Sequence, residues 1–520
     1  MLSKNSLKRL TEAHSWLGLI ISGLLFVVFF CGSISLYRAE INEWAIQPHF
    51  TLEQGEQKNI SDIIEIAISG QQFDAKEHVT LLLPNDEAPY YRAFVDVLHE
   101  EGEPDHVSML IDPVSGEKLV EGEQFFLADF IYKLHYDLNF SAGKYIIGFV
   151  TLLFFFALAS GVLIHAKKLI TNFFQYRAQQ NKRSKLLDMH NVIGVMSLPF
   201  TLMYAISGLI FNLVIIYQIA FALALYKGDQ ETLLSDAGFI DVHPQWQAKP
   251  WHNVDIDTAY KDIAHRTDFD PVFVRLYNYG DASAVLHVGG GIEHQIGGRF
   301  DIAKELTTQK EIVMNDPVNT NAVRKGLQVV ANLHFGSYAG FDLRLLYFVL
   351  GLAVSVLIIA GNLLWLEKYS RQRSASANVL RFTSKYTLVS TAGVLFATTV
   401  AFVLERVMPI DLSMRGELLI YGFILALCLS SISTYFYLDI KQCLANTLRV
   451  SALLGLLLVG YDLIVHFSRI VELTSAGKTS VAWVDAAVLL VSAFTLLAAN
   501  KLSHKVSDTS SMPDEQLQAS

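Results

Sequence analysis

The sequence predicts an all-α polytopic membrane protein of about eight helices, with two small α+β domains outside the membrane. Of its 520 residues, 52% are hydrophobic and only 17% are charged, and the mean hydropathy is +0.35. Apolar runs near the membrane-spanning length of about 20 residues recur along the chain, and two long polar segments separate them. This composition excludes a single soluble globule and a disordered chain.

Charge and cysteine content exclude further classes. The net charge of -10 argues against nucleic acid as the main partner. The cysteines are Cys31, Cys428 and Cys443, and no two of them form a CxxC pair. The chain therefore has no CxxCH site for covalent haem, and no cysteine framework for an iron–sulfur cluster or zinc.

Eight apolar runs are the predicted membrane spans. The first follows Lys4, Lys8 and Arg9, as the core of a signal peptide would. It is too long for that core and lacks a small-residue cleavage site, so we expect a retained helix. The predicted spans are residues 16–36, 145–164, 192–216, 343–366, 387–404, 418–437, 451–467 and 482–499.

Basic residues near the helix ends predict the orientation. Residues 166–189 carry six basic residues and one acidic residue, and residues 366–385 carry five and one. Both segments and both chain termini should therefore face the cytoplasm. The long loops 38–141 and 228–340 should face the opposite side, and the first of them holds 21 acidic residues against six basic ones.

These signals divide the chain into alternating membrane and loop regions. Each long loop reads as one helix on a small antiparallel sheet. The first has a helical pattern at 62–70, strand patterns at 79–83, 91–97 and 107–112, and a turn at 112–116; the second has a helix at 256–265 and strands at 272–278, 284–288 and 292–296. The predicted regions are the N-terminus and span 1 (1–38), outer domain 1 (39–141), span 2 (142–167), a basic loop (168–189), span 3 (190–222), outer domain 2 (223–341), span 4 (342–366), a second basic loop (367–385), four additional helices (386–500) and a tail (501–520).

The first four spans contain an internal repeat. Spans 1 and 3 each have a histidine followed by one glycine a helical turn later and by a second glycine further along, at identical spacing. A Leu-His pair precedes spans 2 and 4, and a glycine lies near the end of each of these two spans. The matching positions are His14, Gly18 and Gly32 with His190, Gly194 and Gly208, and His135 and Gly161 with His334 and Gly361.

The repeat places two histidines at each face of the membrane, His14 and His190 inside, and His135 and His334 outside. Two facing helices that each supply one axial imidazole can hold a haem, and the small glycines would leave a slot for it. Without CxxCH, these would be two b-type haems. The alternative is that the histidines are interfacial anchors. His165, at the inner end of span 2, is a competing inner ligand.

These segments resemble the PepSY-associated transmembrane helix family, whose members lie in bacterial inner membranes and carry periplasmic PepSY domains. The resemblance covers about residues 8–370 and depends on the order and spacing of several short motifs. They are His14-Ser15-Trp16-Leu17-Gly18, Leu36-Tyr37-Arg38-Ala39-Glu40, Asp112-Pro113-x-Ser115-Gly116, Leu134-His135, Gly143-Lys144-Tyr145, Asp188-Met189-His190-Asn191-Val192-Ile193-Gly194 and Leu333-His334-Phe335-Gly336.

The resemblance implies a function, because characterised relatives include ferric-siderophore reductases with two b-type haems on four helices. Carried over, His14 and His190 would ligate the iron of the cytoplasmic-side haem, and His135 and His334 that of the periplasmic-side haem. The chain would then be an oxidoreductase of the inner membrane that reduces a periplasmic ferric chelate or siderophore. The four helices after residue 386 are additional to the family's core.

Two further features bear on electron and proton supply. Asp462 and His466 lie one helical turn apart on one helix face, and an acid within the membrane is a functional candidate, so the pair could pass protons or bind a quinol. No cytoplasmic segment contains a dinucleotide or flavin motif. We therefore expect quinol or a separate cytoplasmic reductase as the electron donor.

Two other functions remain open from the sequence. The helices could form a haem-free transporter of iron chelates or peptides, with the histidines lining its path. Alternatively, the PepSY-like domains could bind peptides in a regulatory role, with the helices as lipid-embedded anchors.

Overall fold

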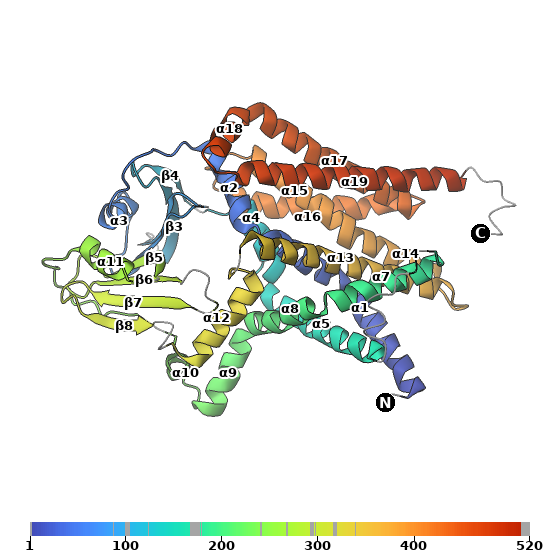
Figure 1. Cartoon of the computed structure of the whole chain (residues 1–520), viewed down its shortest axis with the longest axis horizontal. Coiled ribbons are helices and arrows are strands. Elements are labelled where there is room, and N and C mark those ends of the chain that lie inside the picture. Colours follow the sequence, from blue (N-terminus) through green and yellow to red (C-terminus); the bar gives the residue numbers. More distant parts are fainter. Residues whose placement is uncertain are drawn as a thin grey trace.

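The computed structural model describes residues 3–86, 88–98, 104–122, 124–166, 177, 179–239, 242–266, 269–291, 296, 298–315, 320–338 and 340–510. A bundle of long helices makes up most of it, and a β-sheet lies beyond one end of the bundle (Figure 1). The first turns of α1 and the last turns of α19 lie at the other end. The sheet is therefore on the opposite side of the bundle from both of these helix ends.

Seven continuous helical stretches in the described part of the chain are long and apolar enough to cross a membrane. An eighth span forms if the bent pair α7 (Lys182–Met196) and α8 (Leu198–Asn212) is counted as one. The predicted multi-pass membrane protein is thus confirmed. The seven are α1 (Lys4–Ser35), α5 (Gly143–His165), α13 (Phe341–Ser370), the stretch α14 (Ala377–Leu388), η2 (Val389–Gly393) and α15 (Val394–Val407), α16 (Arg415–Phe436), α17 (Ile440–Val465) and α19 (Ser480–Ser510).

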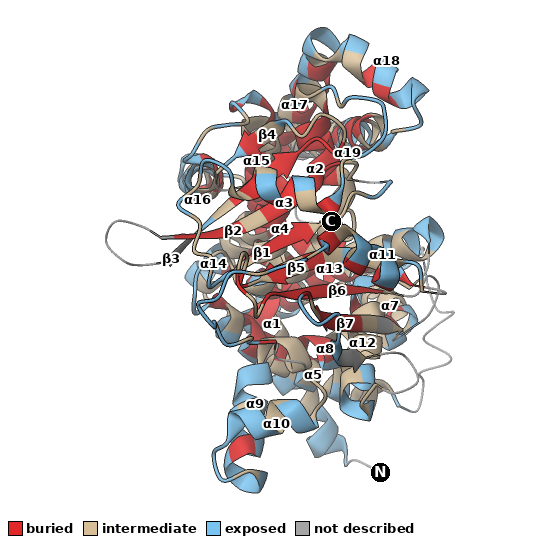
Figure 2. Cartoon of the chain, turned by 90° about the vertical axis from the view of Figure 1, so that its left-hand side faces the viewer, coloured by how far each residue is buried: buried red, intermediate tan, exposed pale blue. Residues whose placement is uncertain are grey.

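The third span differs from the straight helix predicted at 192–216. Its two helices meet at 64° next to Ser197. Pro199 lies in the first turn of α8, where its missing N–H and its ring prevent α7 from continuing straight. The apolar run then continues as α9 (Val214–Leu225), which projects from the bundle with α10 (Gln230–Asp236) and is largely exposed (Figures 1 and 2).

The two long loops share one eight-stranded antiparallel sheet, where two separate small sheets were expected. Its order is β4-β3-β2-β1-β5-β6-β7-β8, and the first strands of the two loops pair, with Thr80 opposite Arg275. The pairing satisfies backbone groups that would otherwise lie at two open edges. The strands are β1 (His78–Leu82), β2 (Tyr91–Leu98), β3 (Pro104–Ile111), β4 (Lys118–Glu121), β5 (Asp270–Tyr277), β6 (Val285–Gly291), β7 (Arg299–Glu305) and β8 (Glu311–Asn315).

One face of this sheet is covered by two helices, α3 (Ile60–Ile68) and α11 (Ile256–Ala264). Alternate strand residues such as Val79 and Leu81 pack with them into one core. Both helices were predicted, as were β1, β2, β3, β5 and β6; most of the strand expected at 292–296 lies outside the described residues. The opposite face, which we call the second face, carries the side chains between these core positions, and from it Leu110 of β3 packs into the core of the bundle.

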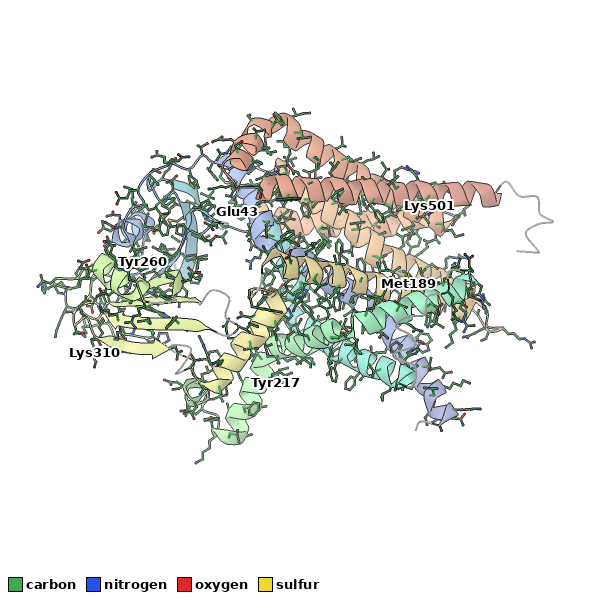
Figure 3. All side chains as sticks on the ribbon, viewed as in Figure 1. Glu43, Met189, Tyr217, Tyr260, Lys310 and Lys501 are labelled. Carbon is green, nitrogen blue, oxygen red and sulfur yellow. The ribbon has the colours of Figure 1, made fainter. Side chains whose placement is uncertain are left out.

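Short elements link the sheet to the bundle. They are α2 (Arg38–Ile46), η1 (Gln47–His49), α4 (Leu127–Tyr136) and α12 (Ala322–Phe335), whereas α18 (Phe467–Ser475) joins α17 to α19. Trp44 of α2 is fully buried, and the neighbouring Glu43 accepts a hydrogen bond of 2.5 Å from Tyr90 next to the sheet. Glu43 lies where the sheet meets the bundle (Figure 3), and burial raises the pKa of its carboxyl to about 7.

A buried arginine joins α2 to the additional helices. The side chain of Arg406 on α15 has no exposed surface, and its Nε donates to Asp462 Oδ2 on α17 at 2.9 Å. Its Nη1 donates to the carbonyl of Trp44 at 2.7 Å, and its guanidinium lies 3.8 Å from the centre of the Trp44 ring. The Trp44 indole in turn donates to Asp485 on α19 at 2.8 Å.

A second buried arginine connects these helices to α4. Arg415 at the start of α16 donates to the carboxylate of Glu405 at 3.0 Å, and the other Glu405 oxygen accepts from the backbone N–H of Leu127 at 3.1 Å. Leu127 is the first residue of α4, where a carboxylate satisfies a free N–H and complements the helix dipole. The additional helices thus fix the N-terminus of α4.

We predict that Asp462→Ala lowers the free energy of unfolding by about 3–5 kcal/mol, because it leaves the buried Arg406 guanidinium without its ion-pair partner. Unfolding in mixed micelles measures this. Asp411→Ala, at an exposed position in a turn, is the matched control and should change stability by less than about 0.5 kcal/mol. Replacing both partners by apolar residues, Arg406→Met with Asp462→Leu, should recover most of the loss. Equal effects of the two alanine changes would contradict this role.

Candidate functional site

Two histidines meet at the end of the bundle away from the sheet. His14 lies on α1 and His190 on α7, and their ring centroids are 6.4 Å apart with an angle of 83° between the rings. From its sequence position, His14 was expected to begin a helix on the cytoplasmic side, but it lies about three turns into α1. We call these two residues the inner pair.

Each inner histidine is held through its Nδ1 atom by a neighbouring span. His14 Nδ1 lies 3.1 Å from the carbonyl oxygen of Ala157 and 2.9 Å from Ser160 Oγ on α5, and His190 Nδ1 lies 3.3 Å from the Leu357 carbonyl oxygen on α13. Glycines on the same two helices make room for the rings. A Cβ atom at Gly161 or Gly361 would lie 3.4 Å from Cε1 of His14 or His190, respectively.

The other two histidines of the repeat meet at the end nearer the sheet. His135 and His334 lie in the last turns of α4 and α12, and their ring centroids are 6.1 Å apart at 51°. His135 Nδ1 donates to the Val28 carbonyl at 2.7 Å, and His334 Nδ1 lies 2.6 Å from Ser207 Oγ. We call these two residues the outer pair.

The surroundings of the outer pair are tight and apolar. A Cβ atom at Gly32 would lie only 2.6 Å from His135 Nδ1, so the ring depends on this glycine. Burial lowers the pKa of His135, and burial together with His135 lowers the pKa of His334 to about 3. Both rings are therefore neutral at neutral pH, which is the form that coordinates metal ions.

The ring spacing in both pairs is compatible with one metal ion held between the two rings. All four histidines use Nδ1 for a hydrogen bond, and none of their Nε2 atoms has a hydrogen-bond partner among the described residues. A bond of about 2 Å from each Nε2 to one metal ion, plus roughly 1 Å to each ring centre, places two opposed centroids roughly 6 Å apart. The measured separations of 6.4 and 6.1 Å match this value.

The helix α1 contributes to both pairs and so sets the distance between them. It carries His14, and further along it carries the Val28 carbonyl and Gly32, which contact His135. At a helical rise of about 1.5 Å for each position, the pairs are roughly 21–27 Å apart along α1. They therefore lie near opposite ends of one span.

The remaining predicted residues are placed as follows. His165, the last residue of α5, is close enough to both inner histidines to interact with them electrostatically. The carboxylate of Asp462 forms an ion pair with Arg406. The hydrogen bond between Asp462 and His466 is a backbone one, from the His466 N–H to the Asp462 carbonyl oxygen at 2.8 Å. The ring of His466 instead faces His49, 5.7 Å away. Asp462 and His466 thus do not form a side-chain pair.

Sequence reasoning missed Arg406, the ion-pair partner of Asp462, and the chain of contacts that continues from Arg406 to Trp44 and from Trp44 to Asp485. Each lies on a different element, so no spacing along the chain connects them. The available signal was Arg406 itself, a cation directly after an apolar run, since such a residue usually has a partner inside the bundle.

The comparison with known families covers both histidine pairs. None of the curated proteins matches the chain. The family model described as the PepSY-associated TM region matches residues 11–368. This match includes the sheet, the inner pair and the outer pair, and it ends before α14. Because it spans more than half of the 520 residues, the chain belongs to the PepSY-associated TM region family.

Proposed function

We propose that this protein is a b-type dihaem electron-transfer protein of the bacterial inner membrane that reduces a ferric chelate on the sheet side. One observation carries the proposal: two histidine pairs lie at opposite ends of the same spans. In each pair, both Nδ1 atoms are hydrogen-bonded to oxygen atoms of neighbouring helices. The distance between the two ring centroids leaves room for one iron atom between the rings. Interfacial anchors would not need to face each other across two helices.

The chain's own residues would hold and orient the two groups. His14 and His190 would be the axial ligands on the inner side, with Ser160 and two carbonyls fixing their rings. His135 and His334 would be the axial ligands on the outer side, fixed by the Val28 carbonyl and Ser207. Such hydrogen bonds behind the ligands set the ring orientation and raise ligand basicity. Haem, when bound, supplies one-electron chemistry.

The spacing of the pairs suits transfer across a membrane. The pairs lie roughly 21–27 Å apart along α1, which is most of the hydrocarbon thickness of about 30 Å. Two sites therefore divide the crossing into shorter steps. The basic segments predict a periplasmic sheet and a cytoplasmic inner pair, so electrons from quinol or a cytoplasmic reductase would enter at His14 and His190.

A ferric chelate or siderophore is the acceptor that this arrangement suits. Hard oxygen ligands hold Fe(III) more tightly than Fe(II), so one electron weakens the complex and releases the iron. The outer pair lies at the end of the bundle next to the sheet, where a chelate in the periplasm could approach. In this proposal the enzyme is a ferric-chelate reductase.

We expect purified protein from haem-replete cells to contain about two low-spin haems per chain, extractable by acid acetone because no thioether bond is formed. His14→Ala or His190→Ala should remove one haem and leave the other, while His135→Ala or His334→Ala should remove the other one. Pyridine haemochrome assays and reduced-minus-oxidised spectra measure both. A colourless preparation would favour the transporter or peptide-binding alternatives. If the inner haem is lost in His165→Ala but retained in His14→Ala, then His165 is the inner ligand in place of His14.

We also predict that Gly32→Ala lowers the content of the outer haem by more than half while the inner haem is retained. The added Cβ would lie 2.6 Å from His135 Nδ1 and must displace the ring. Gly460→Ala is the matched control, since a Cβ atom there meets nothing within 4 Å. Equal haem content in both variants would show that the His135 ring position is not required.

The direction of transfer can be tested in sealed, oriented vesicles. Reduced protein should be re-oxidised quickly by an impermeant ferric chelate added on the sheet side, and slowly when the chelate is added on the other side. His135→Ala should abolish the fast reaction even where the inner haem is still reduced. Stopped-flow absorbance follows the oxidation. Fast oxidation from the inner side alone would reverse the assigned direction.

A further inference from the structure

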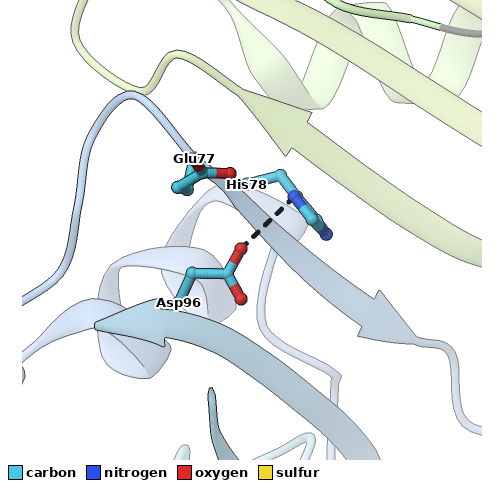
Figure 4. A group of neighbouring side chains, drawn as sticks. All are labelled: Glu77, His78 and Asp96. Carbon is cyan, nitrogen blue, oxygen red and sulfur yellow. Dashed lines mark ion pairs between the residues drawn. The ribbon is translucent and has the colours of Figure 1, made fainter. Parts of the chain in front are cut away.

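A cluster of metal-ligand side chains lies on the sheet, apart from both histidine pairs. Glu77, His78 and Asp96 each offer one ligand atom, and these atoms all lie within 4.8 Å of one another (Figure 4). His78 Nδ1 is 3.4 Å from Asp96 Oδ2. Two ligand atoms on one tetrahedral ion with bonds of about 2.1 Å are roughly 3.4 Å apart. The cluster is thus close to the size of a single ion site.

The strand register brings these residues together. Val79 on β1 pairs with Val95 on β2, so the next positions outward, His78 and Asp96, lie opposite each other on the same face. Asp96 is in turn directly opposite His106 on β3. Because Val79 and Val95 point into the core with α3 and α11, the side chains of His78, Asp96 and His106 share the second face.

His106 holds the carboxylate of Asp96 from the third strand. Its Nδ1 lies 2.5 Å from Asp96 Oδ1, while the second oxygen, Oδ2, faces His78. An imidazole bonded to a ligating carboxylate is a common outer partner at metal sites. The side chain of Asp96 is 9% exposed and those of His78 and His106 are 32% and 73% exposed, so an ion can reach a carboxylate that is itself fixed.

The charges around the cluster favour a cation. Glu77 and Asp96 contribute two negative charges. Within the described part of the sheet, the guanidinium that interacts electrostatically with His78 belongs to Arg275 on β5. Arg275 is engaged with Thr80 Oγ1 at 2.9 Å and with the Tyr277 hydroxyl at 3.3 Å. The two carboxylates outnumber this one guanidinium, so the sum of their charges is negative.

We propose that Glu77, His78 and Asp96, with His106 as the outer partner of Asp96, bind one divalent transition-metal ion on the second face of the sheet. Imidazole and carboxylate ligands together suit Zn²⁺, Co²⁺ or Fe²⁺ better than soft ions such as Cu(I). Three protein ligands leave at least one position for water, so the ion is exchangeable. This site needs neither histidine pair and stands independently of the haem proposal.

The test uses the full-length protein as purified, with loosely bound metal ions removed by a chelator, and dialysed against Zn²⁺ or Co²⁺. Wild-type protein should bind one more ion per chain than Asp96→Asn. His78→Ala should weaken binding at least 100-fold, and His106→Ala roughly 10–100-fold, as for an outer partner. The matched control is His265→Ala, an exposed histidine that caps α11, and it should bind as wild type does. Haem content should be unchanged in all four variants.

Three results would overturn the proposal, and two of them come from the binding assay. One is a wild-type protein that binds no additional ion, and the other is binding that Asp96→Asn and His78→Ala leave unchanged. Circular dichroism reports whether the variants keep the sheet. If they do not, X-ray absorption of zinc-loaded wild-type protein decides, since the site requires imidazole nitrogen at about 2.0–2.1 Å from the metal. A shell of oxygen atoms alone would also overturn the proposal.

Discussion

The buried Arg406 guanidinium is the constraint that organises the outer half of the bundle. A cation without exposed surface must find partners inside the protein, and Arg406 finds them on α17 and α2, with Asp485 of α19 one step away through Trp44. The adjacent Glu405 reaches the N-terminus of α4. Because His135 lies in the last turn of α4, the four additional helices act on the outer pair through one short helix. This gives them a physical role in positioning that pair.

The central helix α1 imposes a second constraint. It supplies His14 directly, and its Val28 carbonyl and Gly32 support His135. A single α-helix has a fixed rise, so the separation of the two pairs does not depend on loops. The positions at which α1 contacts the two pairs are therefore at a fixed distance along its axis.

Much of this architecture could be predicted from the sequence, because spans depend on length and hydropathy alone. The repeat predicted which histidines lie together, and the rings of His14 and His190 and those of His135 and His334 are indeed neighbours. The bend before Pro199 could not be seen in an apolar window, since one missing N–H does not change hydropathy. The β1–β5 pairing joins strands from two different loops with two spans between them in the chain, and the glycines that contact the inner rings are on partner helices. Such contacts belong to tertiary structure and leave no local pattern.

The molecule is joined across its two halves at three levels. The first half contains α1 to α5 and the second α7 to α13, and β1–β5 pairing connects them outside the membrane. Within the bundle, α1 packs on α13 and α5 on α8, and each histidine pair takes one ring from each half. A group ligated between the rings would therefore bind to both halves at once. Ligands that bind only the assembled form stabilise it by mass action, so occupancy of either pair and packing of the halves must be thermodynamically linked.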